Sequence, residues 1–152
     1  MHIKMGGTLM LKESMYQGDA GDKEKERLET FSYPHQVSCM LLDDITFRSL
    51  LDAGAGPSTM LAEYIANGRG ADYYAVDNGK MVVNGQDKFF SDILSEKLAQ
   101  RGITVDVRNA DICNLPYQDN FVDVVHVRFV MMHLPHDQKV AAINEVVRVS
   151  KK

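Results

Sequence analysis

A strand, a glycine turn and the start of a helix follow one another in the first half of the chain, an order that can build a nucleotide-type binding site. Residues Ser49–Ala53 predict a short buried strand that carries Asp52 next to the turn. Gly54 and Gly56 let the backbone turn sharply and approach a ligand closely, because glycine has no Cβ atom. Pro57 suits the first turn of a helix, and the unpaired N–H groups of a helix start bind polar or anionic groups.

The charge of Asp52 discriminates between two classes of ligand for this turn. A dinucleotide site would have a third glycine where this chain has Thr59, and the pyrophosphate of a dinucleotide would be repelled by Asp52. At about 4 Å and an effective dielectric constant of about 20, this repulsion is roughly 4 kcal/mol per charge pair. A ligand that carries an ammonium and a sulfonium group would be attracted instead, so the turn favours such a cationic ligand.

The pattern Asp-x-Gly-x-Gly at the end of this strand resembles motif I of the class I S-adenosylmethionine-dependent methyltransferases. The resemblance implies S-adenosylmethionine as the cofactor. It also implies that the cofactor is contacted by the turn and by a hydroxyl at the helix start. These residues are Asp52, Gly54, Ala55, Gly56 and Ser58.

Asp77 ends the second predicted strand, Asp72–Asp77, and precedes the turn signal Asn78-Gly79. A carboxylate at the carboxyl end of a strand can accept hydrogen bonds from both hydroxyls of a ribose. Methyltransferases have an acidic residue in this role and so do NAD proteins, so Asp77 alone does not separate the two classes. The resemblance implies that Asp77 and Asn78 contact the cofactor, and the alternative for Asp77 is a solvated turn aspartate.

The segment Asn109–Tyr117 follows a third predicted strand at residues 103–107. It resembles the next motif of the same family, an Ala-Asp-x-x-x-Leu-Pro-aromatic run. The resemblance implies that Asp111 accepts the adenine amino group and that Ile112 covers the face of the ring, whereas the alternative for Asp111 is a helix cap or a turn. A dinucleotide-binding protein has no reason to match this segment, which therefore favours the methyl donor.

The apolar run Phe121–Val127 is typical of a fourth strand buried on both faces, and His126 inside it is expected to be a core histidine. The residues that follow resemble the family segment past strand four, which often ends in His-Leu-Pro. We expect Arg128 to face the cofactor and to hold the carboxylate of the donor or a substrate anion. An ion pair of Arg128 with Asp123 or Glu145 is the alternative.

Two further residues take candidate roles from the resemblance. His133 lies where a base could act on the substrate, with helix capping or packing as the alternative. Tyr16 lies in a leader that folds over the cofactor in this family, where a tyrosine is near the methionine end. We therefore add Tyr16 to the expected cofactor-binding residues and keep His133 as the candidate catalytic residue.

Strands that alternate with helices predict an α/β fold, a Rossmann-like doubly wound parallel sheet of the class I methyltransferase type. Residues 1–45 are expected to form a lead-in with cover helices, and residues 46–152 the S-adenosylmethionine-binding core. A helical region interrupted near Gly85 is expected after the second strand. We expect the apolar stripes of the second cover helix and of the last helix to face inward. These stripes are Val37, Met40 and Leu41 in the first of these helices and Val140, Ile143 and Val147 in the other.

The resemblance departs from the family at the C-terminus, where this chain stops just before the family's fifth strand. The core is therefore expected to lack strand five and the hairpin of strands six and seven, which finish the sheet and part of the substrate pocket. The fourth strand would leave an edge of unpaired N–H and C=O groups, through which a homodimer could form. Donor binding would survive this loss, because its groups come from the first four strands.

The composition of the 152 residues limits the classes of partner that we expect. A net charge of −4 without a Lys/Arg cluster argues against nucleic acid. No apolar run approaches the ~20 residues that span a bilayer, and the two cysteines have no metal-binding spacing, so a cytoplasmic protein without a metal site is the default. We expect a methyltransferase that acts on a small-molecule acceptor. The alternatives are a binding or interaction module that transfers nothing, and a nicotinamide-dependent oxidoreductase.

Overall fold

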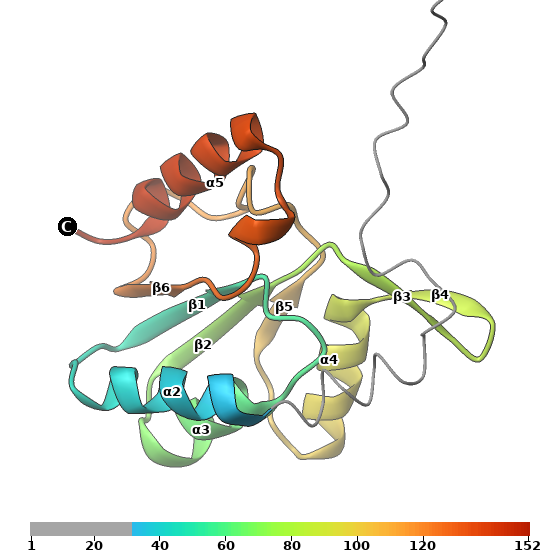
Figure 1. The fold of residues 1–152 in the computed structure, drawn as a ribbon. Coiled ribbons are helices and arrows are strands. Elements are labelled where there is room, and N and C mark those ends of the chain that lie inside the picture. The colour runs from blue at the N-terminus through green and yellow to red at the C-terminus, as the bar shows by residue number, and fades with distance from the viewer. Residues whose placement is uncertain (1–31) are drawn as a thin grey trace, which may run out of the picture.

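The computed structural model describes residues 32–152, in which strands and helices alternate (Figure 1). Tyr16 and the rest of the expected lead-in up to residue 31 lie outside the described residues. None of the described helices combines the length and the apolar character that crossing a membrane requires. The elements, in chain order, are α2 (Ser32–Asp43), β1 (Ser49–Ala53), α3 (Met60–Gly68), β2 (Asp72–Val76), β3 (Lys80–Val83), β4 (Gln86–Phe89), α4 (Phe90–Gln100), β5 (Asp106–Arg108), β6 (Val124–His126), the 3-10 helix η1 (Met131–His133) and α5 (His136–Val149).

Four parallel strands form the main sheet in the order β5-β2-β1-β6. β1 lies inside the sheet, where Leu51 pairs with Tyr74 of β2 on one side and with Val125 of β6 on the other. β5 pairs with the outer side of β2. This topology confirms the predicted parallel α/β sheet, and the first strand has its predicted bounds, Ser49–Ala53.

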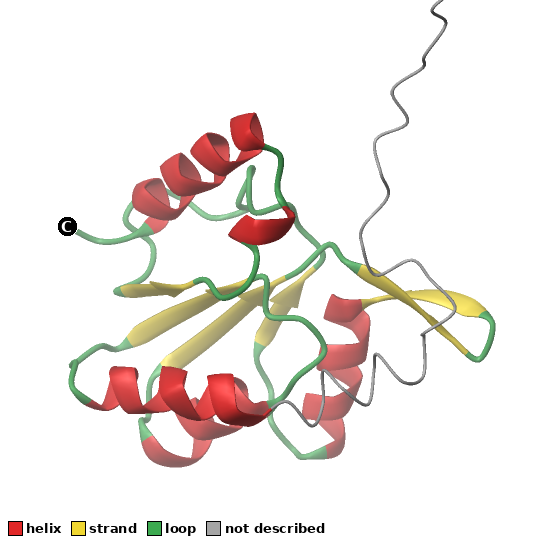
Figure 2. Cartoon of the chain, viewed as in Figure 1, coloured by secondary structure: helices red, strands yellow, loops and turns green. Residues whose placement is uncertain are grey.

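Helices cover both faces of the sheet (Figure 2). α2, α3 and α4 lie on one face, and α5 with η1 lies on the other. Successive residues of β1 point to opposite faces, so Leu50 packs among residues of α3 and α4 while Leu51 packs on the α5 side. All five residues of β1 are buried, so the loop that follows this strand emerges from the centre of the molecule.

β6 is an edge strand and is only partly buried, so the prediction of a strand buried on both faces is wrong. The end of the chain begins to pair ahead of it: Ser150 forms a parallel bridge with Val122, and Lys151 N–H donates to the Val122 carbonyl oxygen at 2.8 Å. Beyond that point no described strand lies on the outer side of β6. The expected open edge is therefore confirmed, and pairing with a second copy through it stays a prediction.

The apolar stripes that we predicted to face inward on α2 and α5 are exposed, so this prediction is wrong. The exposed residues are Val37, Met40 and Leu41 on α2 and Val140, Ile143 and Val147 on α5. Each helix instead buries one small and one large residue, Ser38 and Leu42 on α2 and Ala142 and Val149 on α5. Small side chains let a helix backbone approach the sheet closely, and the Ser38 hydroxyl also has a hydrogen-bond partner there. α2 is thus oriented by this polar contact and by Leu42, and α5 by Ala142 and Val149, and not by the apolar stripes that we predicted.

The interrupted helix that we predicted after β2 is also wrong, because β3 and β4 form an antiparallel hairpin that projects from the main sheet (Figure 1). Asn84 and Gly85 make its turn with φ angles of 53° and 77°, the backbone that two-residue hairpin turns require. The Asn-Gly pair between two short runs with β-forming residues was the available signal. Met81 anchors the hairpin in a small core with Phe90 and Ile93 of α4.

Candidate functional site

The loop between β1 and α3 lies at the carboxyl end of a central strand. Gly54 and Gly56 have φ angles of 85° and 64°, in the left-handed region that favours glycine. The N–H groups of Gly54 and Ala55 both donate to the Val76 carbonyl oxygen, at 2.8 and 3.2 Å. A Cβ atom on Gly54 would lie 2.0 Å from Cγ2 of Val130, whereas one on Gly56 would meet nothing within 4 Å. The loop is therefore closely packed at Gly54 and open at Gly56.

α3 begins at Met60 and not at Pro57, so the predicted helix start is wrong by three residues. The intervening residues continue the loop instead. Ser58 is buried, and its hydroxyl oxygen accepts a hydrogen bond of 3.5 Å from the Met60 N–H. The Ser58 hydroxyl is thus turned toward the start of α3, in agreement with its expected place at the helix mouth.

Asp77 follows β2 directly and holds the glycine loop. Its Oδ2 accepts a hydrogen bond from the Gly56 N–H at 2.8 Å, and its Oδ1 accepts one from the Gly79 N–H at 2.6 Å. Burial raises the pKa of the Asp77 carboxyl despite these two hydrogen bonds, which lower it, and the charge of Asp52 raises it further. Asp77 is therefore a fixed carboxyl group next to the open side of Gly56, while its neighbour Asn78 is exposed.

Asp52 is buried on the α2 face of the sheet with only 4% of its surface exposed. Its Oδ2 accepts a hydrogen bond from the Tyr73 hydroxyl at 2.9 Å, and its Oδ1 lies 2.8 Å from Nδ1 of His126. Burial and the charge of Asp52 hold the pKa of Tyr73 well above its ordinary value. His126 is partly buried and paired, which confirms the expectation of a core histidine. Tyr73 is a site residue that sequence reasoning missed, because nothing in its local pattern marks a partner on β1.

Asp111 and Ile112 lie in the loop after β5, beyond the other edge of β2. Asp111 is exposed, and its Oδ1 accepts a hydrogen bond from the Cys113 N–H at 2.8 Å, which makes it a turn residue as well as a candidate ligand. Ile112 is 6% exposed and packs in the core between the sheet and α5. The three predicted acids, Asp52, Asp77 and Asp111, therefore all lie toward the carboxyl edge of the sheet. The charge of Asp52 raises the pKa of Asp77, which links these two electrostatically.

The segment after β6 carries Arg128 and His133. The guanidinium of Arg128 lies 5.2 Å from the centre of the Phe129 ring, and burial lowers its pKa while the charge of Asp52 raises it. The two acids named as its alternative partners each pair with another cation among the described residues, Asp123 with Lys151 at 2.8 Å and Glu145 with Arg148 at 2.7 Å. Phe129 has a φ of 61°, which is unusual for an aromatic residue. His133 ends η1, where its N–H donates to the carbonyl of residue 130 at 2.9 Å.

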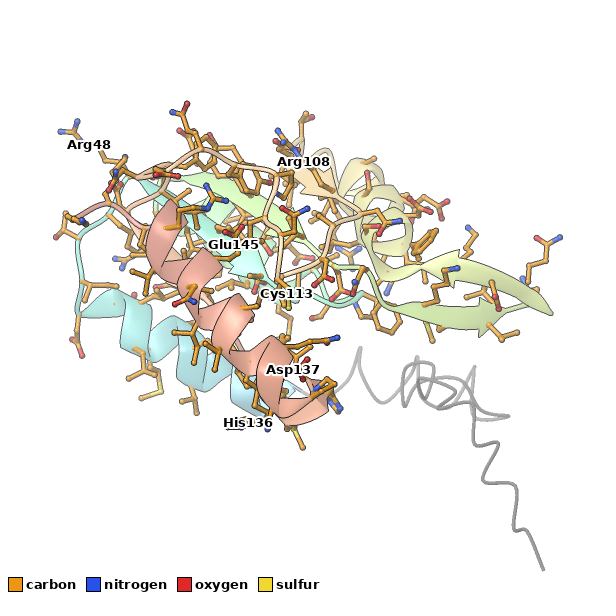
Figure 3. All side chains as sticks on the ribbon, turned by 90° about the horizontal axis from the view of Figure 1, so that it is seen from above. Arg48, Arg108, Cys113, His136, Asp137 and Glu145 are labelled. Carbon is orange, nitrogen blue, oxygen red and sulfur yellow. The ribbon has the colours of Figure 1, made fainter. Side chains whose placement is uncertain are left out.

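Arg148 of α5 ties down the loop that carries Asp111. It pairs with Glu145 at 2.7 Å, and its Nη1 and Nη2 donate to the carbonyl oxygens of Tyr117 and Leu115 at 2.7 and 3.1 Å. Figure 3 shows Glu145 on α5 and Cys113 beside this helix, with His136 at its start. The spacing of Glu145 and Arg148 along one helix was a signal for their pairing, but not for the loop that they hold.

An open hollow of about 540 Å³ is found where β2 and β5 begin, at the amino ends of the strands. Its lining includes Asn67, Asp72, Arg101 and Thr104. Tyr73, whose hydroxyl donates to Asp52, also borders this hollow, whereas none of the predicted site residues does. The three predicted acids are therefore not part of its lining.

A family profile described as a methyltransferase domain matches residues 51–152, which is more than half of the chain. The match begins just before the Asp-x-Gly-x-Gly pattern and includes every site residue that we predicted except Tyr16. No curated protein matches the chain.

Solved structures share the fold at low sequence identity. A putative S-adenosyl-L-methionine-dependent methyltransferase from Methanococcus maripaludis superimposes with a TM-score of 0.69 at 19% identity, over 87% of this chain and 58% of its own. A SAM-dependent methyltransferase from Aquifex aeolicus superimposes with a TM-score of 0.64 at 22% identity, over 85% of this chain and 66% of its own. A putative sarcosine dimethylglycine methyltransferase from Galdieria sulphuraria superimposes with a TM-score of 0.57 at 18% identity, over 91% of this chain and 49% of its own. The chain thus spans about half to two thirds of the length of these structures.

Proposed function

The chain belongs to the methyltransferase domain family, and on that premise we propose that it binds S-adenosylmethionine at the carboxyl edge of its sheet and serves methyl transfer to a small-molecule acceptor. The observation that carries this proposal is the carboxyl group of Asp77. It is held by the N–H groups of Gly56 and Gly79 at 2.8 and 2.6 Å, next to a loop that is open at Gly56.

The residues at this edge fit the ribose of such a ligand. A carboxylate has about four lone-pair positions, and two of those of Asp77 are occupied by backbone donors. The remaining positions can accept hydrogen bonds from the two vicinal hydroxyls of a ribose. Because Gly56 has no side chain, the ligand can approach the loop backbone closely. Asp111 and Asn78, both exposed, are the candidates for contacts with the base.

Bound S-adenosylmethionine supplies an activated methyl group, which an acceptor displaces in line from the sulfonium. The residues of the chain then have to hold the donor, align the acceptor and exclude water. Arg128 offers a partly buried cation for a carboxylate at this edge. A general base is needed only for a hydroxyl or a protonated amine, and His133 in the segment after β6 is the residue that we propose for this role.

Titration calorimetry with S-adenosylmethionine and S-adenosylhomocysteine tests the proposal. We expect both to bind and Asp77→Ala to weaken both by at least about tenfold, the scale of hydrogen bonds to a charged group. Asp87→Ala, at an exposed position of the hairpin, is the matched control and should leave both affinities unchanged. Tighter binding of NADH than of either nucleoside would refute the proposal in favour of an oxidoreductase.

A binding module that transfers nothing is the second candidate function. The assignment of residues favours it, because the groups proposed to hold the donor lie at the strand ends, whereas only His133 is proposed on the acceptor side. Incubation with a methyl-labelled donor and a broad panel of acceptors separates the two functions, with a longer version of the protein as the control. Donor binding without label transfer by either version would favour the binding module.

A further inference from the structure

A chain of hydrogen bonds runs through the interior from α2 to β2. The hydroxyl oxygen of Ser38 lies 2.9 Å from Nε2 of His126, whose Nδ1 lies 2.8 Å from Oδ1 of Asp52. The other oxygen of Asp52 accepts the Tyr73 hydroxyl at 2.9 Å. Ser38, Asp52 and Tyr73 are at most 6% exposed. Four elements, α2, β6, β1 and β2, therefore each contribute one side chain to a single buried network.

The network gives every member a partner of the right kind. When the imidazole of His126 is neutral with its proton on Nδ1, it donates to Asp52, and its Nε2 accepts a hydrogen bond from the Ser38 hydroxyl. The Asp52 carboxylate then accepts from an imidazole N–H and from a phenol. Two of its lone-pair positions are occupied, and the others are available to a further donor.

The position of Asp52 suggests what that donor is. The residue lies two positions before Gly54, and its charge acts on both Asp77 and Arg128, so it belongs to the same edge as the proposed ribose contact. Its direct hydrogen-bond partners among the described residues are a phenol and an imidazole. A buried carboxylate is costly unless it is paired with positive charge. Arg128 already acts on Asp52 electrostatically, and a ligand ammonium group would supply a further cation at the lone-pair positions that remain.

Resting on the function proposed above, we propose that His126 and Tyr73 are positioning residues that orient the Asp52 carboxylate toward the ammonium group of the methyl donor. Tyr73 and His126 each hold one carboxylate oxygen, so the carboxyl plane cannot rotate. Ser38 holds the imidazole and at the same time anchors α2 over this part of the sheet.

Two substitutions of His126 separate its two contacts. His126→Asn places an amide N–H near the position of Nδ1, which keeps the donor to Asp52 and loses the contact with Ser38. His126→Gln places its amide near the position of Nε2, which keeps the contact with Ser38 and loses the donor to Asp52. We expect His126→Gln to weaken S-adenosylhomocysteine binding roughly tenfold, the scale of one hydrogen bond to a charged group, and His126→Asn to stay within about twofold of the unmodified chain.

Binding of 5′-methylthioadenosine distinguishes positioning from a merely structural role. This nucleoside keeps the adenine, the ribose and the thioether but lacks the amino-acid end, so the orientation of Asp52 should not affect its binding. We expect His126→Gln to lower the affinity for S-adenosylhomocysteine while that for 5′-methylthioadenosine is unchanged. Tyr73→Phe, which keeps the packed ring and removes the other donor to Asp52, should change the same ratio in the same direction.

The outcomes distinguish this inference from the function on which it rests. If the unmodified chain binds neither S-adenosylhomocysteine nor 5′-methylthioadenosine, the proposed function itself fails. If it binds both, and His126→Gln and Tyr73→Phe weaken both nucleosides equally, the network is structural and the inference fails alone. Equal losses for His126→Asn and His126→Gln would also overturn it. Tyr73→Phe keeps the test decisive should a His126 variant not fold, which circular dichroism of each variant reports.

Discussion

Asp77 and Asp52 lie at the ends of neighbouring strands, and they obtain their hydrogen bonds in different ways. Asp77 accepts from two backbone N–H groups, those of Gly56 and Gly79. Asp52 accepts from side chains, a phenol on the next strand and an imidazole on β6. Backbone donors persist through almost any substitution of the donor residue, whereas side-chain donors disappear when one residue changes. The site around Asp77 should therefore depend on backbone conformation, and that around Asp52 on residue identity.

The glycine loop that supports Asp77 should show the largest effect. In Gly54→Ala the new methyl group would overlap Val130 at 2.0 Å, and the residue would keep a φ of 85°, so we expect a loss of about 2–5 kcal/mol of unfolding free energy. Gly56→Ala is the control with a similar φ and open space, and it should lose only about 1–2 kcal/mol. Urea unfolding measures both values.

The same experiment has an internal check. Val130→Ala removes the atoms that Gly54→Ala would meet, so the double variant should recover part of the loss. If Gly54→Ala and Gly56→Ala cost the same, the close packing of the loop against the segment after β6 is not what limits this position.

The electrostatic link between the two carboxyl groups gives an intermediate effect. The pKa of Asp77 is raised from 3.8, mainly by burial and in part by the charge of Asp52. Asp52→Asn should therefore lower the pKa of Asp77, whereas Tyr73→Phe, which keeps the charge of Asp52, should not. Carboxyl carbon chemical shifts followed by NMR against pH measure this pKa. An unchanged pKa in Asp52→Asn would contradict the link.

The raised pKa also has a consequence for stability. Between 3.8 and the higher pKa of the folded state, the folded chain binds a proton at Asp77 and the unfolded chain does not. The contribution of this group to stability is therefore fully present below pH 3.8 and is lost as the pH rises through the folded pKa. Asp77→Asn should remove this part of the pH dependence of the unfolding free energy, which urea unfolding at a series of pH values measures.

Asp123 combines both kinds of support at a solvent-accessible position and should show the smallest effect. Its carboxylate accepts hydrogen bonds from Lys151 Nζ at 2.8 Å and from the backbone N–H groups of Arg48 and Ser49 at 2.7 and 2.9 Å. These contacts, the one with Lys151 first, lower the pKa of Asp123 to about 2. Its contribution is present above 3.8 and is lost as the pH falls through about 2. Asp123→Asn should therefore flatten the dependence of the unfolding free energy on pH between about 2 and 3.8, and Lys151→Ala should flatten it in part. Identical curves for all three chains would contradict this account.

The sequence predicted the architecture well where a local pattern is sufficient. The alternation of strands and helices, the bounds of β1 and the buried face of α4 all follow from residues close together in the chain. The hairpin of β3 and β4 also had a local signal, the Asn84-Gly85 pair, and was missed because the apolar residues around it were interpreted as helical. The prediction of the buried faces of α2 and α5 was wrong for another reason. The periodicity of a helix indicates that an apolar stripe exists but not whether that stripe faces the sheet.

What the sequence by itself determined is the turn after Asp77, because the Gly79 N–H that donates to it lies two positions away. The other donor, the Gly56 N–H, lies 21 positions away and reaches Asp77 because β1 and β2 are neighbouring parallel strands. The tertiary structure alone decided the surroundings of Asp52. Its network joins residues separated by 21, 74 and 88 positions, which only the order of strands and the packing of α2 bring together. Backbone turns are specified by the residues that form them, whereas side-chain partners on different elements are specified by how those elements pack.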